Sequence, residues 1–259
     1  MGEDELLYHV EDKVAYFTIN REKQRNALNQ QVGELFMKYL DKADKDENVR
    51  AICLTGKGEK SFCAGADLKV AFGDEEDSSS SVPRAYAELF KKMTAYGKPL
   101  VARVNGPCLA GGIGIMLSCD IVIARNDTFF CTPEVNVGIF PMMIAAMMYR
   151  DLGWKKATEM ALTGRKISAF EAEKIGLITK AVKPSILDKE VKEVLSTLTL
   201  KSPIGIRIGK NAVMAIKDMS FNDQIDYLCD NLFKLTSTAD AREGISAFNE
   251  KRKPEFKGI

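Results

Sequence analysis

The first half of the chain alternates between two hydrophobic periods. Short runs of β-branched and aromatic residues predict strands at 14–20, 51–55, 99–104 and 121–124. Between the first two runs, apolar side chains recur at the i, i+3, i+4, i+7 spacing of one helix face, with Asn29 placed to cap that helix: Val32, Leu35, Phe36, Tyr39, Leu40 and Ala43. Strand and helix in alternation indicate a mostly parallel α/β core.

The pattern changes after Val182, where strand signals end. Helical periodicity follows at 187–199, 203–217 and 221–250, and the last stretch is expected to break near Ser237. Earlier, the acidic and serine-rich run at 74–82 predicts a surface loop within the α/β region, because strands resume after one further helix.

Composition and charge exclude several classes of protein. The 259 residues are 46% hydrophobic and 28% charged, with a net charge of +1, so no global field draws the chain to nucleic acid. No run of 18 apolar residues predicts a membrane span. Residues 1–5 are acidic and lack the basic start of a signal peptide. We therefore expect a cytoplasmic protein that binds neither nucleic acid nor membrane.

Cysteine and histidine usage argues against a metal site. None of the six cysteines forms a CxxC pair, and several lie inside apolar runs, which predicts buried free thiols in a reducing compartment. The single histidine, His9, precedes the first predicted strand and is expected at the surface. No metal ligand set follows from these residues.

Two short segments of small residues are candidate anion sites. Gly65-Ala66-Asp67 and Ala110-Gly111-Gly112 each follow a strand and precede a helical stretch. Small residues let a ligand approach the main chain, and a helix N-terminus directs free N–H groups at negative charge. Two such groups converging on one carbonyl would stabilise a developing oxyanion. The alternative is that both are ordinary strand-to-helix turns.

Glu134 is the candidate proton-transfer group. Its neighbourhood from Phe129 to Ile144 is strongly apolar, so burial should raise the pKa of its carboxyl and suit it to acid/base work near neutrality. The alternative is a solvent-facing carboxylate in a loop. Four methionines follow, which predict either core packing or a deformable acyl pocket: Met142, Met143, Met147 and Met148.

Three segments together resemble the crotonase superfamily, the enoyl-CoA hydratases and isomerases: 61–68, 105–114 and 130–138. The resemblance implies an α/β fold, a crotonase-type spiral of repeated ββα units over residues 1–200, with a C-terminal helical trimerisation region at 201–259. It implies homotrimers or hexamers built as dimers of trimers. It also implies an acyl-CoA substrate and no separate cofactor, since coenzyme A is part of the substrate.

The resemblance also assigns roles residue by residue. Ala66 and Gly111 match the two backbone donors of the oxyanion hole, and Glu134 matches the family's second catalytic glutamate. Further positions match segments that contact the substrate: Arg25, Ala27, Leu28, Ala64, Asp67, Leu68, Lys69, Gly112, Pro133, Phe140 and Met142. Phe248 and Lys251 match residues that reach the CoA of a neighbouring subunit.

One departure from the family pattern decides the expected reaction. The first catalytic glutamate of the two-glutamate hydratases aligns with Gly114 here. A single glutamate suffices to move a double bond, which slightly favours isomerisation over hydration. The dienoyl-CoA isomerases carry an Asp at the position of Met142, so that subtype is not expected. Hydration without a second carboxylate, and a non-catalytic acyl-CoA-binding relative, remain as alternatives.

Overall fold

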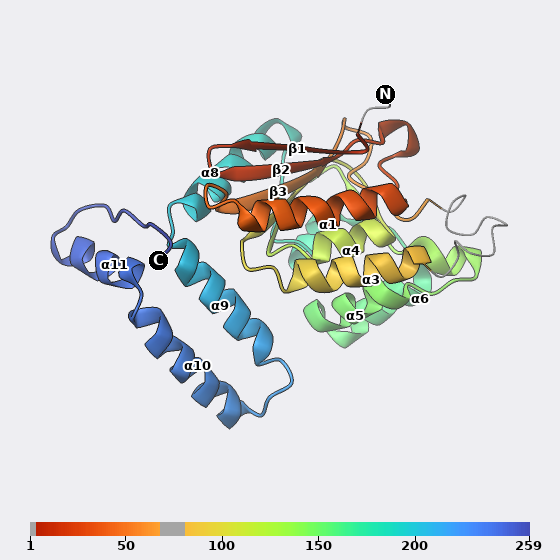
Figure 1. The fold of residues 1–259 in the computed structure, drawn as a ribbon. Coiled ribbons are helices and arrows are strands. Elements are labelled where there is room, and N and C mark those ends of the chain that lie inside the picture. Colours follow the sequence, from red (N-terminus) through yellow and green to blue (C-terminus); the bar gives the residue numbers. More distant parts are fainter. Residues whose placement is uncertain (1–3, 68–80) are drawn as a thin grey trace.

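The computed structural model describes residues 4–67 and 81–259 (Figure 1). Leu68, Lys69 and the 74–80 part of the expected loop lie outside the described residues. A six-stranded sheet in the order β1-β2-β3-β4-β6-β9 forms the centre, and all its neighbouring strands are parallel except β1 and β2. Its strands are β1 (Leu6–Glu11), β2 (Val14–Ile19), β3 (Ala51–Gly56), β4 (Leu100–Val104), β6 (Ile121–Arg125) and β9 (Lys180–Val182).

A second, smaller sheet consists of three short strands: β5 (Cys108–Leu109), β7 (Phe129–Cys131) and β8 (Ile167–Ser168). β5 pairs with β7 in parallel, and β7 pairs with β8 antiparallel. Two isolated parallel bridges extend the layer, Leu28 with Ala66 and Cys63 with Cys108. These short pairings carry the residues of the candidate site.

Helices cover both faces of the large sheet, as a buried parallel sheet requires. The larger core lies under α1 (Gln30–Lys45), α3 (Ser81–Thr94) and α4 (Gly111–Leu117), while α8 (Leu187–Thr199) packs on the opposite face. The remaining elements of this body are α5 (Met142–Asp151), α6 (Trp154–Thr163), α7 (Ala169–Lys174), and the 3₁₀ turns η1 (Glu22–Gln24), η2 (Pro133–Val137) and η3 (Pro184–Ile186).

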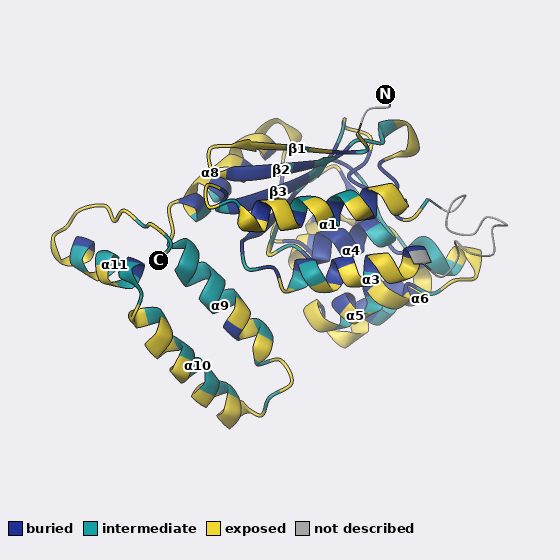
Figure 2. Ribbon diagram, in the orientation of Figure 1, coloured by how far each residue is buried: buried dark blue, intermediate teal, exposed yellow. Residues whose placement is uncertain are grey.

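Three further helices, α9 (Pro203–Ala215), α10 (Phe221–Thr236) and α11 (Ala239–Asn249), form an arm that extends away from the sheets (Figure 1). Figure 2 shows how little of α10 and α11 is buried. Large apolar side chains on the arm are more than half exposed: Val213, Phe221, Ile225, Leu232, Phe233, Ile245 and Phe248. An amphipathic helix normally buries its apolar face, so this arm lacks a covering partner within one chain.

The predicted periodicities are confirmed in most places. Asn29 caps α1 by accepting a hydrogen bond from the Val32 N–H at 2.9 Å. The predicted break near Ser237 separates α10 from α11. The cysteines are free, and all except Cys229 are buried or partly buried.

Other expectations need correction. The first strand of the described residues, β1, was not predicted by the pattern. His9 lies inside that strand, exposed and stacked on Tyr16 at 4.8 Å between ring centroids. Ser81 and Val82 were expected in a loop but begin α3. β1 is an edge strand with one solvent-exposed face, so polar residues interrupt its apolar pattern.

Candidate active site

Parallel pairing brings the candidate segments to one edge of the small sheet. β5 leads into Ala110 and Gly111, and its parallel neighbour β7 leads into the turn that carries Glu134. The Ala110 N–H donates to the Cys131 carbonyl at 2.9 Å, which ties the two strand ends together. Adjacent parallel strands end at the same edge, so the segments that carry Gly111 and Glu134 leave neighbouring strand ends.

Two backbone N–H groups lie next to each other at this edge. In the bridge to Leu28, hydrogen bonds run from Leu28 N–H to the Gly65 carbonyl (2.7 Å) and from Asp67 N–H to the Leu28 carbonyl (2.8 Å), so the Ala66 N–H points away from Leu28. Gly111 is the first residue of α4, where an N–H has no acceptor within the helix. A Cβ on Gly111 would lie 3.6 Å from the Ala66 nitrogen. The pair can receive one carbonyl oxygen.

Unusual backbone angles hold these donors in place. Gly65 has a φ of +93°, and a Cβ there would lie 2.5 Å from the Ala110 Cβ, so only glycine fits. Ala110 itself has a φ of +48° and a ψ of −128°, a conformation that an L-residue rarely adopts. Such strain persists only where the surroundings impose it, and it clusters at functional sites.

Glu134 combines burial with a missing partner. It is the second residue of η2 and is partly buried, and its Oε2 atom is buried with no hydrogen-bond partner among the described residues. Burial raises the pKa of Glu134 above its ordinary value of 4.5, as the apolar neighbourhood predicted, while a hydrogen bond from its own backbone acts in the opposite direction. A buried oxygen without a partner is suited to a substrate group.

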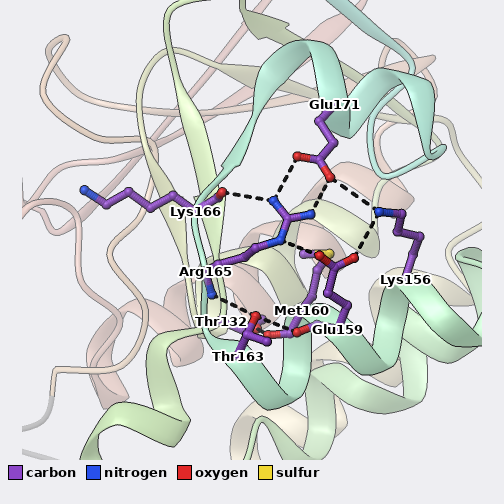
Figure 3. Close-up of polar contacts among 8 residues, drawn as sticks. All are labelled: Thr132, Lys156, Glu159, Met160, Thr163, Arg165, Lys166 and Glu171. Carbon is purple, nitrogen blue, oxygen red and sulfur yellow. Dashed lines mark hydrogen bonds and ion pairs between the residues drawn. The ribbon is translucent and has the colours of Figure 1, made fainter.

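The turn that carries Glu134 rests on α6. The Thr132 hydroxyl, fully buried, donates to the Met160 carbonyl at 2.8 Å (Figure 3). The Cys131 thiol donates to the Gly164 carbonyl at 3.0 Å. Both bonds anchor the residues immediately before Pro133. Since η2 follows directly, they set the position of the Glu134 backbone.

An ion-pair network fixes α6 to α7 behind this turn. Arg165 donates to Glu159 at 2.7 Å and to both oxygens of Glu171, with one of those contacts at 2.9 Å (Figure 3). Lys156 lies 2.9 Å from Glu159 and 3.6 Å from Glu171. Networks of several charges with paired Arg–carboxylate geometry hold elements together better than isolated surface pairs.

Gly114 has no room for a side chain. A Cβ there would lie 2.6 Å from Cζ of Phe90, and the ring's two Cε atoms would lie at 3.1 Å. Phe90 comes from α3 and is 7% exposed. Its aromatic ring therefore covers the position that the family resemblance aligns with the first glutamate of the two-glutamate hydratases.

The other predicted substrate contacts fall into groups. Ala27 and Leu28 are buried, with the Leu28 Cδ1 atom 3.4 Å from a Cβ built on Gly111, whereas Arg25 is exposed. Ala66 is exposed and Ala64 partly buried. Leu28 therefore lies beside the Gly111 donor, and the contacts of all five residues with substrate stay predictions.

Two predicted contacts have structural partners. The Asp67 carboxylate accepts from Arg21 at 3.1 Å, and Arg21 also donates to the Ala27 carbonyl at 2.6 Å. Gly112 is buried against Cys63, where a Cβ would meet the Cys63 carbonyl oxygen at 2.7 Å. These residues shape the site, and no direct substrate contact is needed to explain them.

The residues around Glu134 and those that follow it divide into exposed and buried positions. Pro133 and Phe140 are partly buried, while Met142 is 73% exposed at the start of α5. Met143 is also exposed, whereas Met147 and Met148 belong to the core. Core packing is therefore confirmed for Met147 and Met148, and an acyl-pocket role for Met142 and Met143 stays a prediction.

Phe248 and Lys251 lie on the arm, far from Gly111 in the fold. Phe248 is 83% exposed at the end of α11, and Lys251 follows it with a φ of +55°. Figure 1 shows α11 at the outer end of the arm, away from α4. One chain does not bring these two residues to the Ala66–Gly111 edge.

Sequence reasoning missed Phe90 and Thr132. Tyr86 and Phe90 stand four residues apart in a helical segment, which was a detectable aromatic face. Nothing in the sequence showed which glycine that face meets. Thr132 had no signal beyond its place before Pro133.

Comparisons with known proteins agree with this geometry. The family model described as enoyl-CoA hydratase/isomerase matches residues 9–259. The short-chain-enoyl-CoA hydratase of Clostridium acetobutylicum is 33% identical, over 96% of this chain and 96% of that protein. The 2,3-dehydroadipyl-CoA hydratase of Escherichia coli is 30% identical, over 98% of this chain and 99% of that one.

Solved structures show the same fold. The enoyl-CoA hydratase of Bacillus anthracis superposes with a TM-score of 0.94 at 30% identity, covering 98% of this chain and 100% of that one. The enoyl-CoA hydratase of Mycobacterium smegmatis gives 0.93 at 29% identity, over 98% and 99% of the two chains. The chain belongs to the enoyl-CoA hydratase/isomerase family and has the crotonase fold with its C-terminal helical region.

Proposed function

We propose that this enzyme acts on an enoyl-CoA thioester through one acid/base carboxylate. The thioester oxygen accepts from the N–H groups of Ala66 and Gly111, which stabilise the enolate. Glu134 removes a proton from the carbon beside the carbonyl and returns it further along the acyl chain, so the double bond moves. The observation that carries the proposal is the buried, unpartnered Oε2 of Glu134 at the edge that holds both donors.

Isomerisation is favoured slightly because Phe90 leaves no space for a carboxylate at Gly114. Hydration is the second candidate, since the relatives compared above bear hydratase names. Incubation with crotonyl-CoA and with a 3-enoyl-CoA, followed for 3-hydroxyacyl product and for double-bond migration, separates the two. A protein that binds both thioesters and converts neither would be a non-catalytic acyl-CoA-binding relative.

The pH dependence of the reaction should report on Glu134. Its ionised form is the base, and burial places its pKa above 4.5, so kcat/KM should fall as pH decreases through a value higher than that of an ordinary glutamate. A kcat/KM profile from about pH 4 to pH 9 measures this limb. An acid limb at or below the ordinary glutamate value would contradict the assignment.

The same pKa predicts a stability effect. A carboxyl whose pKa is raised on folding binds protons more tightly in the folded state, so the free energy of unfolding decreases as pH rises from 4.5 through the folded pKa. Glu134→Gln removes this cost. Its midpoint of thermal unfolding should exceed that of the parent at neutral pH and equal it below the ordinary pKa, and equal midpoints at neutral pH would contradict the burial argument.

We also propose that residues 201–259 assemble the chain into a trimer or a dimer of trimers. The exposed apolar side chains of α10 and α11 support this, since a partner would cover them. In such an assembly Phe248 and Lys251 would approach the CoA of a neighbouring subunit. Cytoplasmic localisation and independence from nucleic acid stay predictions. Within residues 4–67 and 81–259, no helix is long and apolar enough to cross a bilayer.

Leu232→Asp tests the assembly. Leu232 is 57% exposed on α10, so the change should leave the monomer folded, but an unpaired charge in an apolar interface costs about several kcal/mol. Sedimentation should show trimers or hexamers for the parent and smaller species for the variant. Asn222→Asp adds the same charge at another exposed position of α10 and should retain assembly. A parent that sediments as a stable monomer would overturn this proposal.

A further inference from the structure

Phe90 lies close to the proposed oxyanion donor at Gly111, although no sequence motif pointed to it. Gly114 follows Gly111 by three residues, so both are on one face of α4, about 4.5 Å apart along its axis. The Gly111 end of this face meets Leu28 and Ala66, and the Gly114 end meets the tip of the Phe90 ring. The ring therefore stands one helical turn from the oxyanion donor.

The position of the ring is fixed by its own helix. Tyr86, one turn earlier on α3, donates through its hydroxyl to the Asn29 carbonyl at 2.7 Å, and its ring lies 3.4 Å from a Cβ built on Gly33. The Tyr86 and Phe90 ring centroids are 6.2 Å apart. These contacts join α3 to the start of α1, immediately after Leu28, and so fix the helix that carries Phe90.

An aromatic ring at this distance restricts the shape of the acyl group that fits beside it. A carbonyl oxygen at about 2.9 Å from the Gly111 N–H places the first acyl carbons within a few ångströms of the α4 face. A flat apolar ring offers no hydrogen bond, packs well against a planar conjugated chain, and leaves no space for a substituent projecting toward it.

We propose that Phe90 is a specificity-determining residue, which selects thioesters whose acyl chain is unbranched at the β-carbon by closing the Gly114 side of the site. This deepens the proposed function and rests on it. The ring contacts the acyl group and takes no part in proton transfer. Its removal should open the site to branched chains without weakening recognition of the CoA portion.

The test measures binding on a Glu134→Gln background, so that turnover does not intervene. Calorimetry gives dissociation constants for crotonyl-CoA, 3-methylcrotonyl-CoA and CoA itself. With Phe90 present, crotonyl-CoA should bind more tightly than its branched analogue. Phe90→Ala should shift the ratio of the two constants by about tenfold toward the branched chain, the scale of one methyl group in a tight pocket, with CoA unchanged. Phe90→Leu, which retains more of the packing, should shift it less in the same direction.

Leu89→Ala is the matched control, because Leu89 is buried beside Phe90 on the same helix, while the three atoms nearest to a Cβ built on Gly114 all belong to Phe90. The ratio should not change there. An unchanged ratio in Phe90→Ala, or an equal shift in Leu89→Ala, would overturn the role of Phe90. Failure of the Glu134→Gln parent to bind either thioester better than CoA would instead overturn the proposed function itself.

A second measurement tests the contact independently of any ligand. Gly114→Ala should lower the thermal midpoint when Phe90 is present, because its Cβ would meet the ring at 2.6 Å. Gly114→Ala should lower the thermal midpoint much less in the Phe90→Ala background. Additive effects in the double variant would show that ring and glycine are not coupled and would overturn the proposal.

Discussion

Glu134→Gln should reduce turnover by about 10²–10⁴-fold, the range expected for loss of a general base. Glutamine keeps the size of the side chain and much of its hydrogen bonding, so the fold should be unaffected. Affinity for the CoA thioester should change little, since backbone groups of Ala66 and Gly111 hold the carbonyl. Steady-state rates together with a dissociation constant for a substrate thioester separate the two effects.

Glu47→Gln supplies the control for this substitution. Glu47 is exposed and lies outside the site, so the same chemical change there should leave turnover at the parent level. Full activity in Glu134→Gln would remove the central claim, and another proton-transfer group would then be required. Equal losses in both variants would indicate a general effect of charge.

Gly111→Pro should cost about 3–4 kcal/mol of transition-state stabilisation, the effect of losing one oxyanion donor. The substitution deletes the N–H, and any distortion of the turn adds to this cost. Gly111 is the first residue of α4, the helix position that tolerates proline best. Rates measured on protein with a parent-like circular dichroism spectrum give the value.

The strained backbone of Ala110 directly before this position makes a proline control necessary. Ala239→Pro places the same residue at the first position of α11, after an extended N-cap, and should leave chemistry in the site unchanged. A folded Gly111→Pro variant with near-parent turnover would show that the carbonyl oxygen is held elsewhere.

Much of the fold follows from local periodicity alone. The stripe after Asn29, the four apolar strands and the helical C-terminal quarter were all readable, because each element buries a face whose spacing is set by its own geometry. The break between α10 and α11 was readable for the same reason. Short elements such as β5 and β8 were not, since two residues carry no period.

Some features of the candidate site could also be predicted from the sequence, and others could not. Glu134 lies in an apolar stretch of sequence, and two turns consist of small residues. Both are local features, so the sequence alone indicated the carboxylate and the turns whose main chain is accessible. It also places glycine at position 114, which the resemblance aligns with the first glutamate of the two-glutamate hydratases.

Only the tertiary structure decided how those groups meet. Parallel pairing of β5 with β7 brings Gly111 and Glu134 to one edge, and the bridge from Leu28 to Ala66 turns the second donor toward it. Packing of α3 on α4 placed Phe90 over Gly114. These are contacts between residues distant in the chain, and their energy depends on helix and strand placement that no local pattern of side chains encodes.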